Sequence, residues 1–129
     1  MRCIVVTPEK TVLETEATFV ALPLYDGELG ISEKHTPLIG RVGAGRLRAM
    51  RDAGESVSYY VEGGFVEVLD DTVTLLTSRA IPTDQLDAEA ASEQLTETLK
   101  RPATTEDALN AREKESQYLR NLIRLAKRD

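Results

Sequence analysis

The sequence predicts a mainly β N-terminal domain followed by an antiparallel hairpin of two α-helices. In residues 2–77, short segments rich in Val, Ile, Thr, Tyr and Phe alternate with Gly, Pro and Asp, which is typical of β-strands and turns. After Pro82 these signals stop, and Ala, Glu, Leu, Gln, Lys and Arg dominate to the end. A chain of 129 residues can hold one compact core and a small appendage. We therefore expect a β-domain over residues 1–82 and a helical domain over residues 83–129.

The β-domain is expected to contain nine strands, at a spacing typical of a sandwich or a barrel. Turn residues at 52–54 and at 70–71 predict two β-hairpins. The segment 64–69 is apolar at nearly every position, so we expect it to lie centrally with both faces covered. Gly63 and Gly64 predict a β-bulge, in preference to a close approach of another backbone segment. The expected strands are 3–7, 12–17, 19–22, 28–31, 37–42, 46–51, 56–62, 64–69 and 73–78.

The helical domain is expected to begin at Asp87, which can cap a helix that runs to about Lys100. Pro102 cannot continue this helix, and Thr104 with Asp107 resembles a capping box for a second one. The first helix has a narrow apolar side, and that of the second is patchy in its first half and continuous only in the last two turns, so we expect modest burial between them. These sides comprise Ala91, Leu95 and Leu99 in the first helix, and Leu109, Arg112, Ser116, Leu119, Leu122, Ile123 and Ala126 in the second, over about 105–127.

Composition and charge exclude several classes of function. The net charge of −6 opposes a general attraction to nucleic-acid phosphates, so nucleic acid is not an expected partner. One cysteine and one histidine cannot form an internal disulfide or a Cys/His metal site. The longest apolar runs fall far short of the roughly 20 residues that a membrane-spanning helix needs, and the first residues lack a secretory signal. We therefore expect a cytoplasmic protein with no direct membrane insertion.

No catalytic constellation surrounds the single histidine. His35 could act as a base beside Ser32 or Asp26, but this spacing matches no nucleophile motif. A histidine next to Thr-Pro is more often a loop residue with a structural hydrogen bond. The glycines of residues 40–45 lack the order of a dinucleotide or phosphate loop, so they are interpreted as loop residues between strands. No enzymatic activity is expected of this chain.

Two charged segments are candidates for binding. Asp26, Glu28 and Glu33 could hold a metal ion, but they lack the spacing of a calcium loop. A solvated acidic loop, or a contact for a polar partner, is the preferred interpretation. Six basic residues near the C-terminus either form a solvated face that complements the end of a helix or dock on an acidic surface. They are Arg112, Lys114, Arg120, Arg124, Lys127 and Arg128.

Several motifs occur in register from about Val20 to Ala91: DGELGI at 26–31, HTPLI at 35–39, Gly45, YVEGGFVEV at 60–68, VTLL at 73–76, Ala80 and the pair Leu86 and Asp87. Together they resemble the epsilon subunit of the bacterial F-type ATP synthase. The resemblance implies a ten-stranded β-sandwich of two five-stranded sheets, followed by a two-helix hairpin. It also implies a non-catalytic subunit of the central stalk, which couples proton-driven rotation of the c-ring to ATP synthesis through the gamma subunit.

The resemblance assigns partners to the two domains. It implies that Asp26, Glu28 and His35 belong to a loop that contacts the polar loops of the c-ring, while the other side of the sandwich binds gamma. The helical hairpin would inhibit ATP hydrolysis by extending toward the acidic base of the beta and alpha subunits of the catalytic head, where the six basic residues would make contact. The expected location is peripheral, on the cytoplasmic face of the inner (plasma) membrane.

A second hypothesis is an ATP sensor whose hairpin closes on nucleotide. By the resemblance, Leu86, Asp87, Arg120 and Arg124 would contact ATP. In many members of the family an arginine stands where this chain has Ala90, so the guanidinium fork that would hold phosphate is missing. We therefore expect no cofactor, and the regulatory nucleotide remains the alternative.

Overall fold

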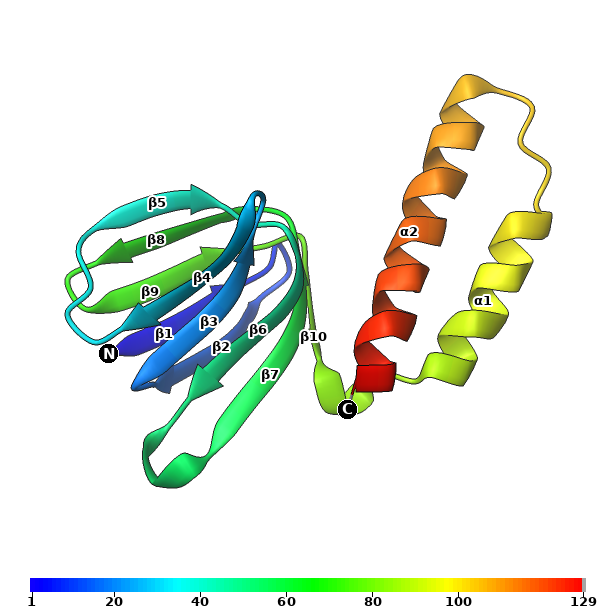
Figure 1. Cartoon of the computed structure of the whole chain (residues 1–129). Coiled ribbons are helices and arrows are strands. Elements are labelled where there is room, and N and C mark those ends of the chain that lie inside the picture. Colours follow the sequence, from blue (N-terminus) through cyan, green and yellow to red (C-terminus); the bar gives the residue numbers. More distant parts are fainter. Residues whose placement is uncertain (129) are drawn as a thin grey trace. The chain divides into compact units, whose positions relative to one another are not determined.

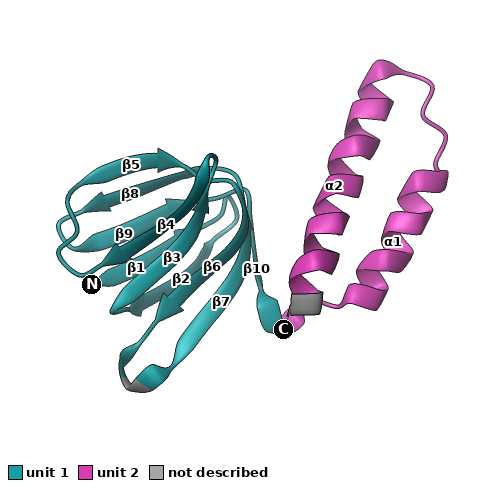
Figure 2. Cartoon of the chain, viewed as in Figure 1, with its two compact units in different colours: residues 1–84 teal, residues 85–129 magenta. Residues whose placement is uncertain are grey.

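The computed structural model confirms the expected fold class. Ten strands form two five-stranded sheets, and two α-helices follow them (Figure 1). The structure describes residues 1–128, and the side chains of all of these except Ala53, Lys127 and Arg128. The chain divides into two compact units, residues 1–84 and residues 85–129 (Figure 2).

The strands of the first unit form two sheets, here named sheet A and sheet B. In sheet A the order is β2-β1-β9-β8-β5, with a parallel β1–β9 pair and antiparallel neighbours elsewhere. In sheet B the order is β10-β7-β6-β3-β4, and all pairs are antiparallel. The bounds are β1 Arg2–Val6, β2 Thr11–Glu16, β3 Phe19–Leu24, β4 Gly27–Ser32, β5 Leu38–Arg41, β6 Ala44–Met50, β7 Ser56–Glu62, β8 Phe65–Leu69, β9 Thr72–Leu76 and β10 Arg79–Pro82.

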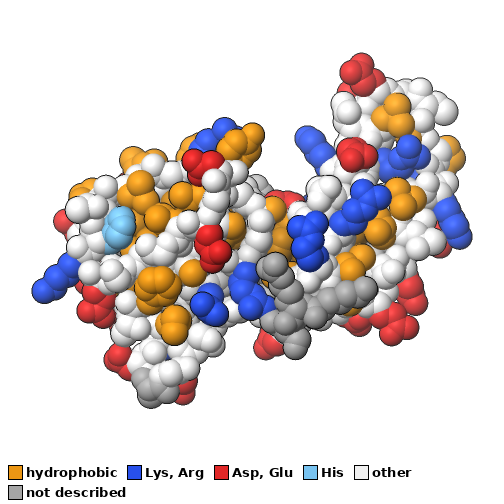
Figure 3. All heavy atoms as spheres, in the orientation of Figure 1, with side chains coloured by type: hydrophobic (Ala, Val, Ile, Leu, Met, Phe, Trp, Pro, Cys, Tyr) orange, Lys and Arg blue, Asp and Glu red, His pale blue; other side chains and the backbone are white. Residues whose placement is uncertain are grey.

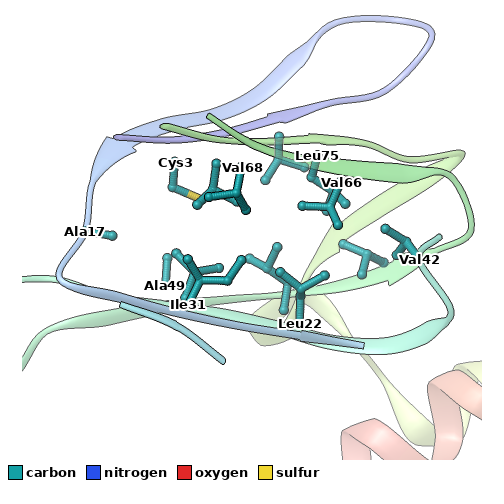
Figure 4. Close-up of a cluster of buried hydrophobic side chains, with 14 of the residues drawn as sticks. Cys3, Ala17, Leu22, Ile31, Val42, Ala49, Val66, Val68 and Leu75 are labelled. Carbon is teal, nitrogen blue, oxygen red and sulfur yellow. The ribbon is translucent and has the colours of Figure 1, made fainter. Parts of the chain in front are cut away.

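The core lies between the two sheets. Val66 and Val68 of β8 point from sheet A toward Leu22 of β3 and Ile31 of β4 in sheet B (Figure 4). Alternate residues of each strand enter this layer because side chains point to opposite faces of a strand in turn. Burial of each such Val, Leu or Ile side chain stabilises the fold by about 1.5–3 kcal/mol.

The prediction of nine strands is wrong by one, since β10 was not expected. Ile81 of β10 pairs with Tyr60, and Pro82 pairs with Tyr59. Pro82 lacks a backbone N–H, and a proline in a sequence argues against a strand at that position. It is tolerated here because β10 is the edge of sheet B. The tenth strand agrees with the count that the family resemblance implies.

The predicted position of the strand at 64–69 is only partly right. This strand, β8, lies between β9 and β5, away from the edges of sheet A. Its outer face is open in this chain, where Phe65 is 56% and Leu69 47% exposed. The expectation that both faces are covered is therefore wrong for the chain by itself. A run of apolar residues indicates a covered strand only if something lies on each side of the sheet.

The turns at Asp70 and Gly64 differ in how well they were predicted. The hairpin between β8 and β9 turns at Asp70 and Asp71, whose φ angles of 51° and 57° lie in the left-handed region that a type I′ turn requires. Gly64 has φ 103°, and a Cβ atom there would lie 1.8 Å from the carbonyl oxygen of Leu76. The β8–β9 register runs without a shift. The expected β-bulge is therefore wrong, and Gly64 permits a close approach of backbone.

The second unit consists of α1 (Ala88–Lys100) and α2 (Glu106–Arg128), preceded by a 3₁₀ turn over Thr83–Gln85. Asp87 caps α1 as predicted, since its Oδ1 accepts hydrogen bonds from the backbone N–H groups of Glu89 and Ala90 at 3.0 and 3.1 Å. The cap of α2 was placed one residue too early. Thr105, and not Thr104, accepts the N–H of Ala108 at 3.1 Å through its Oγ1.

The buried side of each helix matches the predicted stripe in part, since Ala91 of α1 and both Ser116 and Leu119 of α2 are buried as expected. Ala91 and Thr98 are buried in α1, whereas Leu99 is 48% exposed. At 3.6 residues per turn, a spacing of seven residues returns to the same side, and a spacing of eight drifts by about 80°. In α2 the buried residues are Ser116, Leu119 and Leu125, while the predicted Leu109 is 44% exposed.

Candidate functional site

The two expected acidic residues lie at the tip of the β3–β4 hairpin. Leu24 pairs with Gly27 and Pro23 pairs with Glu28, so Tyr25 and Asp26 form a tight turn. Asp26 and Glu28 are both exposed. Leu29 packs against the core, and Glu28 therefore points to the outer face of sheet B. The tip offers two carboxylates to solvent or to a partner.

An aromatic–cation pair braces this tip. The backbone N–H of Tyr25 donates to the carbonyl of Arg41 at 2.9 Å, and the Arg41 guanidinium carbon lies 4.6 Å from the centre of the Tyr25 ring. Arg41 ends β5 of sheet A, so the pair ties the edges of both sheets together. Sequence reasoning missed it because Tyr25 lies in a turn of sheet B while Arg41 ends a strand of sheet A, and no local spacing signals such a contact.

His35 does not share this tip. It follows the opposite end of β4, and Glu28 and Ser32 are separated by about 13 Å of strand. Its Nδ1–H donates to the carbonyl of Thr36 at 2.7 Å, which is the structural hydrogen bond expected of a loop histidine. Nearby, the N–H of Lys34 donates to Asp71 Oδ1 at 2.9 Å. The structure therefore does not bring His35 together with Asp26 and Glu28 in one loop.

The outer face of sheet A carries an exposed group of apolar side chains that the sequence did not single out. We name as the apolar patch the side chains Ile39, Phe65, Leu69 and Leu76, which are 72%, 56%, 47% and 53% exposed. They lie on the three adjacent strands β5, β8 and β9, and Phe65 pairs directly with Leu76. One signal could have found the patch: residues of both parities in 65–69 are apolar, although only one parity faces the core.

The basic residues of α2 do not form one face. Arg112 is partly buried, and its Nη1 donates to the carbonyl of Arg101 at 3.1 Å, so it closes the α1–α2 connection. Lys114, Arg120 and Arg124 are exposed, and Figure 3 shows Lys and Arg side chains along the visible side of the helical unit. Arg120 and Arg124 are one helical turn apart and share a side. The side chains of Lys127 and Arg128 lie outside the described residues.

The expected nucleotide contacts lie where the two helices of the hairpin begin and end. Leu86 and Asp87 precede α1, while Arg120 and Arg124 belong to the last part of α2. One carboxylate oxygen of Asp87 already accepts two backbone N–H groups at the start of α1. Ala90 is exposed there and offers no donor for a phosphate.

The possible metal ligands and the single thiol are further candidate reactive groups. Within the described residues, no three His, Cys, Asp or Glu side chains gather to hold a metal ion. Burial in an apolar layer raises the pKa of the Cys3 thiol to about 11, so it stays protonated and unreactive at neutral pH. No helix of the described chain is long and apolar enough to span a bilayer.

Comparison with known proteins identifies close relatives. The family described as "ATP synthase, Delta/Epsilon chain, beta-sandwich domain" matches residues 1–83. An ATP synthase epsilon chain of Rhodopirellula baltica is 44% identical over 127 residues, which cover 98% of each chain. An ATP synthase epsilon chain of Delftia acidovorans is 45% identical over 87 residues, covering 67% of this chain and 63% of its own.

A solved structure shares the fold. It is a chain in the cryo-EM structure of the Euglena gracilis mitochondrial ATP synthase, OSCP/F1/c-ring in rotational state 1, with a TM-score of 0.78. The match covers 93% of this chain and 77% of that one at 22% identity, so it bears on the fold alone.

Proposed function

The chain belongs to the epsilon-chain family of ATP synthase, in which it is a non-catalytic subunit, and we propose that it joins the gamma subunit to the c-ring and restrains ATP hydrolysis. The sandwich supplies the two binding surfaces. The helical hairpin supplies the inhibition. In this proposal the subunit is peripheral to the membrane and lies on its cytoplasmic side.

The apolar patch is the observation that carries the proposal, as the surface for gamma. Four large apolar side chains on adjacent strands are exposed in the chain, and contiguous exposed apolar surface is typical of protein–protein interfaces. Covering the part of each side chain that is still exposed would contribute roughly 1–2 kcal/mol before the cost of association is subtracted. Because the patch lies on three paired strands whose inner faces form the core, it is already arranged for binding.

The acidic tip is assigned to the c-ring. Asp26 and Glu28 are exposed on a tight hairpin that Arg41 and Tyr25 tie to the neighbouring sheet. A rigid pair of carboxylates complements polar and basic loops and orients a contact more than it strengthens it. His35, at the other end of β4, falls outside this contact.

The hairpin is assigned to regulation. Its interior is small and partly polar, with Ala91, Thr98 and Ser116 among its buried residues. Small differences in free energy, of a few kcal/mol, can therefore decide between a folded and an extended arrangement. The 23 residues of α2 span about 34 Å when helical, long enough to reach the acidic base of the catalytic head. Arg120 and Arg124 are the cations we expect there.

The test compares the full chain with residues 1–84 alone. Each is added to a catalytic head that contains gamma but lacks this subunit, and binding and ATP hydrolysis are measured. Both forms are expected to bind gamma, because the patch lies in the first unit, and only the full chain is expected to inhibit. Equal inhibition by the two forms would exclude the role of the hairpin, and loss of binding on Phe65→Ala with Leu76→Ala would support the assignment of the patch.

A further inference from the structure

A carboxylate lies within the apolar patch. Glu67 occupies the middle of β8, on the same outer face as Phe65 and Leu69, which are two residues away on either side. Across the neighbouring strands it faces Ile39 of β5 and Thr74 of β9. Directly opposite side chains in a sheet have Cβ atoms about 4.5–5.5 Å apart. Three of the four nearest side chains on this face are therefore exposed hydrophobic groups.

Glu67 has no partner of its own among the described residues. Some other carboxylates on the strands are paired, since Glu62 lies 3.4 Å from Arg79 and Glu14 pairs with Arg2. Arg41 shares the outer face of sheet A, but its guanidinium stacks on Tyr25. No ion pair or side-chain hydrogen bond within the described part of the chain involves Glu67, and in the free subunit its carboxylate is hydrated.

A partner that covers the patch also removes water from Glu67. An ionised carboxylate without water or a counter-charge is strongly disfavoured, whereas a charged hydrogen-bonding partner offsets the lost hydration. Apolar contact by itself is non-directional and does not fix how two flat surfaces are aligned. A single pair of charges inside an apolar interface would set that alignment.

We infer that the partner bound at the apolar patch presents a basic side chain to Glu67, and that this ion pair fixes the register of the complex. A guanidinium suits the position best, because it can bind both carboxylate oxygens at once and is more weakly hydrated than an ammonium group. The inference rests on the proposed gamma interface and adds the chemistry of the residue that gamma must contribute.

The competing interpretation is that Glu67 only keeps the free patch soluble. A charge on an open apolar sheet face discourages self-association. In that case the complex forms despite Glu67, and removing the charge strengthens binding or leaves it unchanged. The two interpretations therefore predict different results for the same substitution: weaker binding if Glu67 forms the ion pair, and equal or stronger binding if it does not.

The experiment measures the dissociation constant of the full chain for the gamma-containing catalytic head at low and high salt. Glu67→Gln is expected to weaken binding about 10-fold and Glu67→Lys about 100-fold or more, as for one member of a buried charge pair. Glu55→Lys, which makes the same charge change at an exposed turn position of sheet B, is the control and is expected to bind like the wild type. Because Glu67 is exposed and unpaired, the melting temperatures of its variants should match that of the wild type.

Two further variants distinguish failure of the proposed ion pair from failure of the proposed gamma surface. If Phe65→Ala and Leu76→Ala weaken binding while Glu67→Gln does not, the ion pair is excluded and the gamma surface stands. If neither apolar substitution changes binding, the proposed surface fails, and the inference fails with it. A gamma variant in which one Arg or Lys of its contact face is replaced by Glu, and which restores binding to Glu67→Lys, identifies the basic residue.

Discussion

The two units of this chain are stabilised in different ways. In the sandwich, side chains such as Leu47, Val61 and Leu75 are fully buried between two sheets. In the hairpin, the buried residues include Thr98 and Ser116, and large side chains such as Leu99 and Leu109 remain about half exposed. The sandwich therefore resembles a rigid platform for binding, while the hairpin has little to hold it in one packing. A subunit that must stay attached and also change state needs both properties.

The same side-chain deletion, Leu to Ala, should have its largest and most different effects in the cores of the two units. Leu75→Ala leaves a cavity in the sandwich core and is expected to lower the free energy of unfolding by about 2–5 kcal/mol. Leu119→Ala is expected to reduce only the order of the hairpin, because Leu119 is a buried residue of the second unit. Urea unfolding followed by circular dichroism, with hydrogen exchange resolved along the chain, measures both.

The difference between the two units is tested by where in the chain Leu119→Ala lowers protection from hydrogen exchange. Leu119→Ala should leave exchange in the sandwich strands and binding to gamma as in the wild type, while exchange in α1 and α2 speeds up. If Leu119→Ala destabilises the strands as much as Leu75→Ala does, the two units unfold as one, and the distinction between platform and switch is wrong.

The buried thiol provides a pH test confined to the sandwich. Cys3 has a folded pKa of about 11 against an ordinary value of 9.0. Below pH 9 the thiol is protonated in both the folded and the unfolded chain, so the free energy of unfolding does not depend on its titration there. Between pH 9 and 11 the unfolded chain loses this proton first, so the free energy of unfolding should fall by about 2–3 kcal/mol.

Other groups titrate in the same range, so the measurement is a difference. Urea unfolding at pH 8, 9.5 and 11 is compared between the wild type and Cys3→Ala. The wild type should lose more stability than the variant as the pH rises. Parallel curves for the two proteins would mean that Cys3 is reached by solvent, and that the sandwich core is looser than its burial indicates.

Removal of the helix cap should weaken the hairpin alone. Asp87→Ala removes the acceptor for the N–H groups of Glu89 and Ala90 and is expected to cost α1 about 1 kcal/mol. Hydrogen exchange of the first turn of α1 should speed up, with no change in the strands. Asp84→Ala removes an exposed carboxylate that caps neither helix, and it serves as the matched control. Equal effects of the two substitutions would point to net charge as the cause.

The smallest expected effect concerns the brace of the acidic tip. Arg41→Ala removes the cation over the Tyr25 ring and should lower the stability of the sandwich by about 0.5–1 kcal/mol. Lys10→Ala, which removes an exposed cation from the β1–β2 loop, should have no measurable effect on urea unfolding. A proteolysis assay should also show faster cleavage near Asp26 in Arg41→Ala only. Unchanged cleavage there would mean that the hairpin tip is rigid without its brace.

Much of the fold follows from local patterns. Alternating apolar residues and the Asp70–Asp71 turn predict most strands and their hairpins, because both depend on near neighbours in the chain. Asp87 predicts its own helix start for the same reason. The helix stripes were less accurate, since the choice between Thr98 and Leu99 as the buried residue depends on where the other helix lies. The resemblance to a family supplied the tenth strand that local signals missed.

The candidate binding surfaces follow less from local patterns than the fold does, because they depend on contacts between distant parts of the chain. Asp26 and Glu28 are visible as an exposed acidic turn from spacing and composition, but the bracing of this turn by Arg41 depends on a hydrogen bond between two sheets. The position of Glu67 among Ile39, Phe65 and Leu69 depends on the pairing of β5 with β8, which joins residues far apart in the chain. Near-neighbour patterns set the type of each element. The order of strands in a sheet sets which side chains share a surface, because it is made by long-range pairing that no local pattern encodes.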